Sequence, residues 1–162
     1  MSIDPTEYRR VLGHFPTGVT VVTGADADGP AGMAIGSFAS VSLEPPLVMF
    51  CPAKSSATWQ RIQGTGAFCV NVLGHDQESI CAVFAGRADD KFEGIEWTTA
   101  VTGAPVIPGA IATIDCEIHA VYDGGDHDIV VGLVQSMTTS EDAPARGPLL
   151  FFQGGYGRYE RL

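Results

Sequence analysis

The segment GMAIGSFASVSLEPP, from Gly32 to Pro46, contains residue types that suit contact with a flat heterocycle. It combines two glycines and several small or hydroxyl-bearing residues with a rigid Pro-Pro end. Glycine permits close approach of a ligand to the backbone, and exposed N–H groups and serine hydroxyls can donate to the acceptors of a heterocyclic ring. Taken alone, the segment is more simply an ordinary strand that contains glycine.

The segment CPAKSSATWQRI has the residues of an anion site. Lys54, Ser55, Ser56 and Thr58 stand at the start of a predicted helix. The first N–H groups of a helix have no intrahelical acceptor, and together with hydroxyls and one cation they can bind a phosphate. The same Ser and Thr side chains could merely cap the helix, which is the simpler interpretation.

A polar loop, FAGRADDKF, follows the next predicted helix and could be only a solvated charge cluster. However, the chain has nine cationic side chains and a net charge of −10, and four of the cations fall in the two segments that flank the proposed ligand elements. These four are Lys54, Arg61, Arg87 and Lys91. Local attraction of an anion could therefore oppose the unfavourable net field.

The turn sequence GGDHD carries His127 between Asp126 and Asp128. A histidine in a turn is more often simply exposed to solvent. At the mouth of a pocket, however, an imidazole that titrates near neutral pH could contact a second substrate or transfer a proton.

The bulk composition excludes several classes of function. The 162 residues suit a single domain, 1–162, with a substantial core. The net charge of −10 argues against a nucleic-acid partner, since such binding needs clustered Lys and Arg. No run reaches the roughly 18 apolar residues of a membrane helix, and no signal region opens the chain, so we expect a cytoplasmic protein without membrane contact. The four cysteines lack metal-ligand spacing, so we expect reduced, mostly buried thiols and no metal site.

Strands must position most of these residues, because β-branched and alternating segments dominate the chain. Ser37–Leu43 alternates Phe38 and the serines against Ala39, Val41 and Leu43, which predicts a half-buried strand. Thr113–Ala120 alternates in the same way and predicts a strand whose wet face includes Asp115. The other predicted strands are Val19–Thr23, one beginning near Pro30 after the turn GADADG, Leu47–Cys51, Ala67–Leu73, Ile129–Met137, and Leu149–Gln153 before a Gly- and Tyr-rich tail.

Three helices are predicted between the strands. Asp4 and Glu7 suit the capping box of a helix that runs to about Leu12. The other two are Ser55–Gln63, ended by Gly64, and Asp76–Ala85, stopped by Gly86. Because short strands outnumber helices and do not alternate with them, the expected fold is mainly β, a closed barrel with short helical insertions.

Taken in order, the motifs resemble the flavin reductase-like, FMN-binding split-barrel family, and in particular the small reductase components of two-component flavin-dependent monooxygenases. The similarity runs from LGHFPTGVTVVTG through GMAIGSFASVSLEPPLVMFCP, the KSSATW helix start, FCVNVL, FAGRADDKF and GGDHDIVVG to GGYGRY. The resemblance implies a six-stranded, split barrel of Greek-key type that forms a homodimer, with the flavin near the subunit interface.

The resemblance also implies a set of site residues. The residues implied on the ring side of the flavin are Gly32, Met33, Ala34, Gly36 and Ser37, with Cys51, Pro52 and Ala53 on the adjoining strand end. Those implied near the ribityl phosphate are Ser56, Ala57 and Thr58, and those closing the site are Val83, Phe84, Arg87, Lys91 and Phe92. His127, Tyr156, Arg158 and Tyr159 are implied on the nicotinamide side, with His127 as the catalytic residue. Ile35-Gly36 departs from the family pattern, in which a polar residue often precedes the serine. Contact with the flavin ring at this point therefore depends on the backbone and on Ser37.

The implied activity is transfer of a hydride from NADH, or NADPH, to FMN or FAD, which then serves a partner monooxygenase. No catalytic triad is expected, because the cofactor carries the chemistry and the protein mainly aligns two rings. The absence of a basic cluster for a 2′-phosphate favours NADH. The alternatives are a non-catalytic flavin carrier or redox sensor, and a split-barrel protein that uses haem or a deazaflavin.

Overall fold

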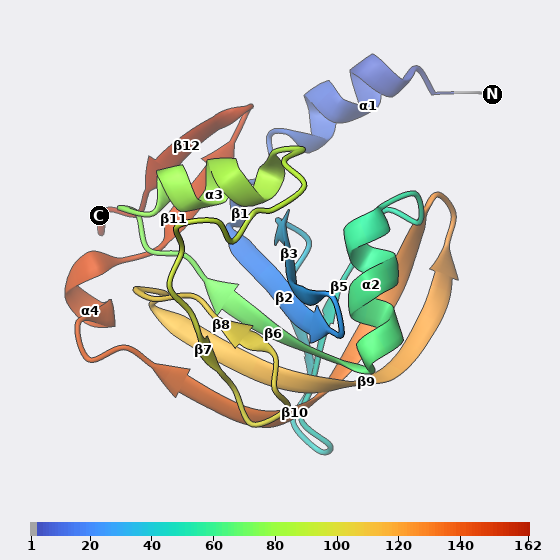
Figure 1. The fold of residues 1–162 in the computed structure, drawn as a ribbon. Helices are drawn as coiled ribbons and strands as arrows, with labels where there is room; N and C mark the ends of the chain where they lie inside the picture. The colour runs from blue at the N-terminus through green and yellow to red at the C-terminus, as the bar shows by residue number, and fades with distance from the viewer. Residues whose placement is uncertain (1–2) are drawn as a thin grey trace.

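The computed structural model describes residues 3–162, and strands dominate it (Figure 1). The helices are α1 (Pro5–Leu12), α2 (Ala57–Thr65), α3 (Glu78–Ala85) and α4 (Ala143–Arg146). The longer strands are β2 (Thr20–Asp26), β3 (Gly29–Ile35), β4 (Ala39–Ser42), β5 (Leu47–Phe50), β6 (Ala67–Val72), β9 (Ala112–Gly124) and β10 (His127–Thr139). The remaining strands are β1 (Thr17–Gly18), β7 (Thr98–Thr99), β8 (Pro105–Val106), β11 (Leu149–Phe152) and β12 (Gly155–Arg158). No helix within residues 3–162 has both the length and the apolar character to span a bilayer.

The main sheet is antiparallel throughout, with the order β3-β2-β6-β9-β10-β5-β4. Strands β6, β9 and β10 lie side by side in the sheet, and β5, which precedes β6 in the chain, pairs with β10 on the far side, which is a Greek-key arrangement. The sheet curls around its core, and β3 and β4 remain as its two edges (Figure 1). The predicted mainly β, split-barrel fold is confirmed, although the sheet has seven strands rather than six.

Both faces of strand β2 are covered by apolar side chains. Val21 and Val22 point to opposite faces, as successive strand residues must, and both are fully buried. Inside the barrel, Val22 joins a cluster that includes Trp59 and Ile62 of α2. Outside it, Val21 joins a cluster that includes Phe84 of α3. The two helices therefore pack on opposite faces of the same strands.

Helix α1 begins where the sequence predicts. The carboxylate of Asp4 accepts hydrogen bonds from the N–H groups of Thr6 and Glu7, which caps the first turn. The predicted capping box is wrong, because the carboxylate of Glu7 pairs with the guanidinium of Arg10 instead. No residue of α1 is buried against the rest of this chain.

Helix α2 begins and ends later than predicted. Ser56 is the N-cap, and its hydroxyl accepts a hydrogen bond from the N–H of Trp59 at 3.2 Å. The helix continues through Gly64 and stops at Gly66, whose φ of +76° is the left-handed conformation that glycine adopts without a steric penalty. With two glycines two residues apart, the pattern alone did not identify the one that adopts positive φ.

The strand predicted at Ser37–Leu43 is shorter and more exposed than expected. Only Ala39–Ser42 forms a strand, β4, and it pairs with β5 at the edge of the sheet. Val41 is exposed, and the side chain of Leu43 is 92% exposed, so the apolar face of this segment is not covered within the described chain. Alternation predicts two faces, but not whether an element packs on either of them.

The strand predicted at Thr113–Ala120 is part of the longer β9, and its supposed wet face is partly buried. Asp115 is buried because the loop between β7 and β8 lies over it. Its carboxylate accepts bonds from the backbone N–H of Thr102 at 2.8 Å and from the Thr102 hydroxyl at 2.6 Å. These bonds satisfy a buried polar side chain, whose burial would otherwise be costly. The tail likewise continues into a strand, since β12 pairs with β11.

Candidate active site

One face of the edge strand β3 carries small residues and lies beneath helix α3. Ala31, Met33 and Ile35 point toward the core inside the barrel, whereas Gly32, Ala34 and Gly36 lie on the opposite face. A Cβ atom at Gly32 would lie 2.6 Å from Cε1 of Phe84 and 2.8 Å from its Cδ1. The glycine is therefore required for close packing of α3 on the strand. Gly32 therefore has a structural role as a strand glycine in close packing, and contact with a ligand would be a second role.

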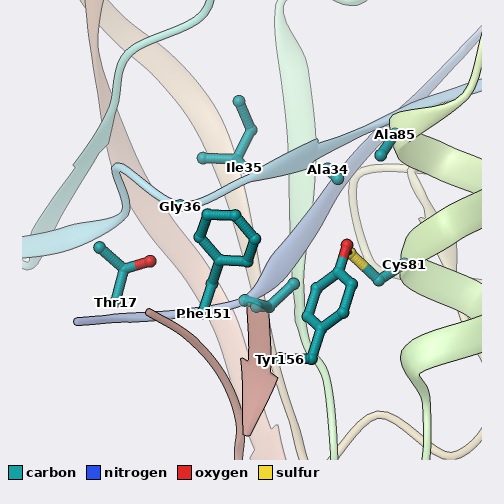
Figure 2. Close-up of a pocket in the computed structure, with 9 residues that line it drawn as sticks. Thr17, Ala34, Ile35, Gly36, Cys81, Ala85, Phe151 and Tyr156 are labelled. Carbon is teal, nitrogen blue, oxygen red and sulfur yellow. The ribbon is translucent and has the colours of Figure 1, made fainter. Parts of the chain in front are cut away.

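A small cleft of about 140 Å³ opens at the end of this face, between β3, α3 and the β11–β12 hairpin (Figure 2). The Sγ atom of Cys81 and the phenolic oxygen of Tyr156 point toward one another across it, 3.2 Å apart. This hydrogen bond, together with burial, raises the pKa of Tyr156 to about 12. The phenol therefore stays neutral at physiological pH. The lining includes three of the predicted residues, Ala34, Gly36 and Tyr156, together with Thr17, Val19, Ile35, Cys81, Ala85 and Phe151.

A narrow crevice lies at the other end of the same face, between β3, the first turns of α2 and the loop after α3. Lys91 donates from Nζ to the carbonyl of Phe84 at 2.9 Å, and its burial lowers the pKa of the ammonium group. The N–H groups of Ala57 and Thr58, in the first turn of α2, have no intrahelical acceptor. The crevice lining includes four predicted residues, Gly32, Thr58, Lys91 and Phe92, together with Pro30, Ala31, Arg61, Ala88 and Asp89.

A wider groove of about 640 Å³ contains His127, and we name it the His127 groove. The Nδ1 atom of His127 lies 2.8 Å from a carboxylate oxygen of Asp126, which orients the ring. The lining includes two predicted residues, Cys51 and His127, together with Ile3, Pro5, Tyr8, Arg9, Gly124, Asp126 and Ile129. The sequence offered no signal for Tyr8 and Arg9, because only the fold places α1 beside a turn more than a hundred residues away.

Ser37 joins the small-residue face of β3 to the His127 groove. Its hydroxyl oxygen accepts a hydrogen bond from the N–H of Cys51 at 2.8 Å and lies 3.3 Å from the Cys51 carbonyl, to which it donates. The turn after β3 is thereby held against the end of β5. Two segments that the sequence assigned to one ligand are thus adjacent in the structure.

The other predicted site residues are more dispersed. Met33 packs on the core inside the barrel, and Phe84 is buried against Phe92, with their ring centroids 5.0 Å apart. Pro52 is buried and Ala53 is half-buried beside the groove, whereas Val83 and Arg87 are exposed on and after α3. Arg158 and Tyr159 are exposed in the tail, where Arg158 pairs with Glu160 at 3.1 Å.

Two of the four cations noted in the sequence are engaged by carboxylates rather than left free for an anion. Arg61 binds Asp26 through Nε and Nη2, at 2.8 and 2.7 Å, and also donates to the carbonyl of Gly29. Lys54 pairs with Asp123 and donates to the carbonyl of Gly125. These two ion pairs offset part of the positive charge that the sequence places beside the proposed ligand elements.

The Asp26–Arg61 pair predicts a specific acid sensitivity. The guanidinium holds the pKa of Asp26 at about 2, below its usual value of 3.8. A depressed carboxylate pKa stabilises the fold above pH 3.8, and that contribution is lost as the pH falls through 2. Asp26→Asn should therefore lower stability at pH 7 and weaken the decline in the urea midpoint between about pH 4 and pH 2. Asp89→Asn, at an exposed position, is the control, and an unchanged acid profile in Asp26→Asn would contradict the assignment.

The fold is an antiparallel split barrel with three depressions: a cleft and a crevice at the two ends of the small-residue face of β3, and the His127 groove. Residues 12–160 match the family described as the flavin reductase like domain. The chain belongs to the flavin reductase-like domain family.

Known members of the family cover nearly the whole chain. The reductase subunit HsaB of a flavin-dependent monooxygenase from Rhodococcus jostii (strain RHA1) is 49% identical over 155 residues, which are 96% of this chain and 78% of that protein. Nitrilotriacetate monooxygenase component B from Mycobacterium thermoresistibile superposes with a TM-score of 0.92 at 46% identity, covering 96% of this chain and 86% of that one. The NADH:FAD oxidoreductase SgcE6 of Streptomyces globisporus C-1027, in complex with NAD and FAD fragments, superposes with a TM-score of 0.90 at 42% identity. The superposition covers 99% of this chain and 97% of that one.

Proposed function

We propose that this protein is an NADH-dependent flavin reductase that supplies reduced flavin to a partner monooxygenase. The observation that carries the proposal is the Ser37–Cys51 contact, which joins the small-residue face of β3 to the groove that holds His127. Two flat substrates must lie face to face for hydride transfer, and two adjoining depressions suit that requirement. The relatives named above support the same activity.

The residues present fit a flavin. Strand β3 pairs only with β2 in the described chain, so its outer edge has backbone N–H and C=O groups available to a heterocycle. Small side chains on that strand leave room for a ring to approach. The first turn of α2 and Lys91 supply N–H groups and a cation beside the crevice, which suit a phosphate.

The proposed roles of the site residues are those that the family resemblance implies. Flavin contact is assigned to Gly32, Met33, Ala34, Gly36, Ser37, Cys51, Pro52, Ala53, Ser56, Ala57, Thr58, Val83, Phe84, Arg87, Lys91 and Phe92, and nicotinamide contact to His127, Tyr156, Arg158 and Tyr159. Met33 and Phe84 are buried or packed on the core, so their contribution comes through the backbone or through packing. The hydroxyl of Ser37 already bonds Cys51, so Ser37 also shapes the site by holding that strand end.

When bound, the flavin supplies the redox chemistry, in which one hydride from NADH and one proton from solvent yield the two-electron-reduced form and NAD⁺. The protein contributes alignment and exclusion of water. His127, held by Asp126, orients the nicotinamide or relays the proton. The neutral phenol of Tyr156 can donate a hydrogen bond at the edge of the cleft.

Further features belong to the same proposal. The cofactor is FMN or FAD, and NADH is favoured over NADPH because two of the four cations noted in the sequence, Lys54 and Arg61, are already paired with carboxylates. Residues 1–162 form one flavin reductase-like domain that acts as a homodimer in the cytoplasm. Size-exclusion chromatography tests the dimer, limited proteolysis tests the single domain, and cell fractionation tests the compartment.

Steady-state kinetics test the proposed activity. We expect purified protein to oxidise NADH in air only when FMN or FAD is present, and measurement across the four flavin and nucleotide combinations ranks both preferences. Anaerobic addition of NADH should bleach the visible absorbance of the flavin. A protein that binds flavin but never bleaches it would be a carrier or sensor, and the reductase assignment would then be wrong.

The four thiols give a test of the flavin site that does not depend on turnover. Burial raises the pKa of Cys69 and of Cys116 to about 12, and Cys81 is also buried, whereas Cys51 is half-buried beside the groove. Thiolates are the reactive form, so an aromatic disulfide reagent should modify Cys51 first and the other three only after denaturation.

Saturating FMN should slow the modification of Cys51 by about fivefold or more, because ligand occupancy reduces the accessible population. Cys51→Ser removes the fast phase and identifies it. An unchanged rate with FMN bound would remove Cys51 from the proposed flavin site.

A further inference from the structure

The turn that carries His127 is bonded to the segment that leads from β5 into α2. An isolated antiparallel bridge pairs Ala53 with His127, and one backbone hydrogen bond lies on each side of it. These bonds run from the N–H of Lys54 to the carbonyl of Asp126 and from the N–H of Asp128 to the carbonyl of Pro52, both at 3.0 Å. Figure 1 shows the β9–β10 turn beside the start of α2. The segment assigned to flavin and the turn assigned to nicotinamide therefore form one hydrogen-bonded unit.

The side chain of Lys54 closes the same unit from outside. Its ammonium group donates to the carbonyl of Gly125 at 2.7 Å and forms an ion pair with the carboxylate of Asp123. The Asp123 carboxylate raises the pKa of Lys54, with smaller contributions from Asp128 and Asp126. Both contacts are made with residues of the turn, so the ammonium group is committed to the turn rather than to the first turn of α2.

The turn needs such a restraint on physical grounds. Gly124 and Gly125 lack side chains that would limit their backbone, and Gly125 adopts a φ of +84°. Asp123, Asp126 and Asp128 place three carboxylates around one reversal of the chain, and they repel one another. The indole Nε1 of buried Trp59 donates to Asp128 at 2.8 Å, which leaves Lys54 to hold the opposite end of the turn.

We propose that Lys54 is a positioning residue for the reduction: it holds the turn so that the imidazole of His127 stays over the groove beside Cys51. The inference rests on the proposed function and adds a residue that acts through His127 rather than by touching a substrate. This positioning role for Lys54 replaces the phosphate contact that the sequence suggested for it.

The test uses Lys54→Met, which keeps the apolar stem and removes the charge. At saturating flavin, we expect the KM for NADH to rise by about tenfold, because small displacements of an orienting group are costly. The Kd for FMN should change by less than about twofold, since no flavin contact is lost. Amide hydrogen exchange in the 124–128 turn should be about tenfold faster, with exchange in β2 and β6 unchanged. Lys54→Arg should restore much of the NADH affinity, and Arg161→Met controls for loss of one positive charge.

A double-mutant cycle with His127→Ala separates positioning from a general structural role. If Lys54 acts through His127, Lys54→Met should add little to the defect already caused by His127→Ala. Additive effects of the two substitutions would overturn the inference, as would a weakened FMN affinity with an unchanged KM for NADH, which would return Lys54 to a phosphate site. If the unaltered protein oxidises no NADH, the proposed function itself fails, and the exchange rates alone decide whether Lys54 holds the turn.

Discussion

Gly132→Ala should lower the free energy of unfolding by about 2 kcal/mol, since one added methyl group overpacks the core. A Cβ atom at Gly132 would collide with Cζ of Phe68 and would lie 2.9 Å from its Cε1 and 3.0 Å from Cβ of Cys116. The ring of Phe68 is fully buried and meets Phe50 edge-on at 5.0 Å, so it cannot move aside without disturbing a second aromatic ring. Urea unfolding followed by tryptophan fluorescence, with an unchanged m-value, measures the effect.

The same substitution at Gly64 is the matched control, and its expected effect on the free energy of unfolding has the opposite sign. Gly64 lies within α2, and a Cβ atom there would meet no atom within 4 Å. Gly64→Ala should therefore stabilise the protein by about 0.5–1 kcal/mol, because alanine loses less backbone entropy in a helix. Equal effects at the two positions would show that the packing around Gly132 is looser than the distances indicate.

His127→Ala should lower kcat/KM for NADH by about 100-fold while leaving the Kd for FMN within about twofold, because an orienting and proton-relaying group is lost from one substrate only. The imidazole lines the groove and is oriented by Asp126, but its removal leaves the core untouched. Stopped-flow reduction of saturating flavin by NADH, together with a flavin-binding titration, separates the two effects.

His127→Gln and His119→Ala complete this experiment. Glutamine retains hydrogen bonding without titrating near neutral pH, so a recovered rate would assign His127 to orientation and a persistent defect to proton transfer. His119 is exposed on β9, away from the groove, and its substitution should have no effect. A kcat/KM that is unchanged in His127→Ala would remove the proposed catalytic role.

Much of the fold could be predicted from local patterns. The strand positions, the three longer helices and the mainly β class agree with the structure, because β-branched runs, alternation and caps act over a few residues. The errors lie where a distant element decides the outcome. Asp115 looks exposed by alternation, yet the loop that contains Thr102 covers it. Leu43 looks half-buried, yet no described element packs on it.

The buried polar network around Asn71 shows the same limit. Asn71 is fully buried, donates to the carbonyl of Val21 at 3.1 Å, and accepts from the N–H of Ile107 at 2.8 Å. It thereby holds the segment after β8 against the main sheet. In sequence, Asn71 is one polar residue within an apolar strand, and its partners lie 50 and 36 positions away.

The candidate site could be predicted in its parts but not in its arrangement. The segment at Gly32–Pro46 was identified by its small residues, and the structure assigns Gly32 a second task, the close packing of α3. Lys54 precedes the N-cap of α2 by two residues, as the sequence predicts, but its ion-pair partner could not be predicted. Local spacing placed it near a helix start, whereas its charge meets the carboxylate of Asp123, 69 residues later.

By itself, the sequence determined the succession of strands and helices, the acidic and turn-rich character of the chain, and the residue types available for binding a flavin. Only the tertiary structure decided which strand faces are covered, which cations are paired, and that the turn of His127 is bonded to the segment after β5. The physical reason is that propensity and alternation act between neighbouring residues. Burial and ion pairing depend on which distant segments the barrel brings together.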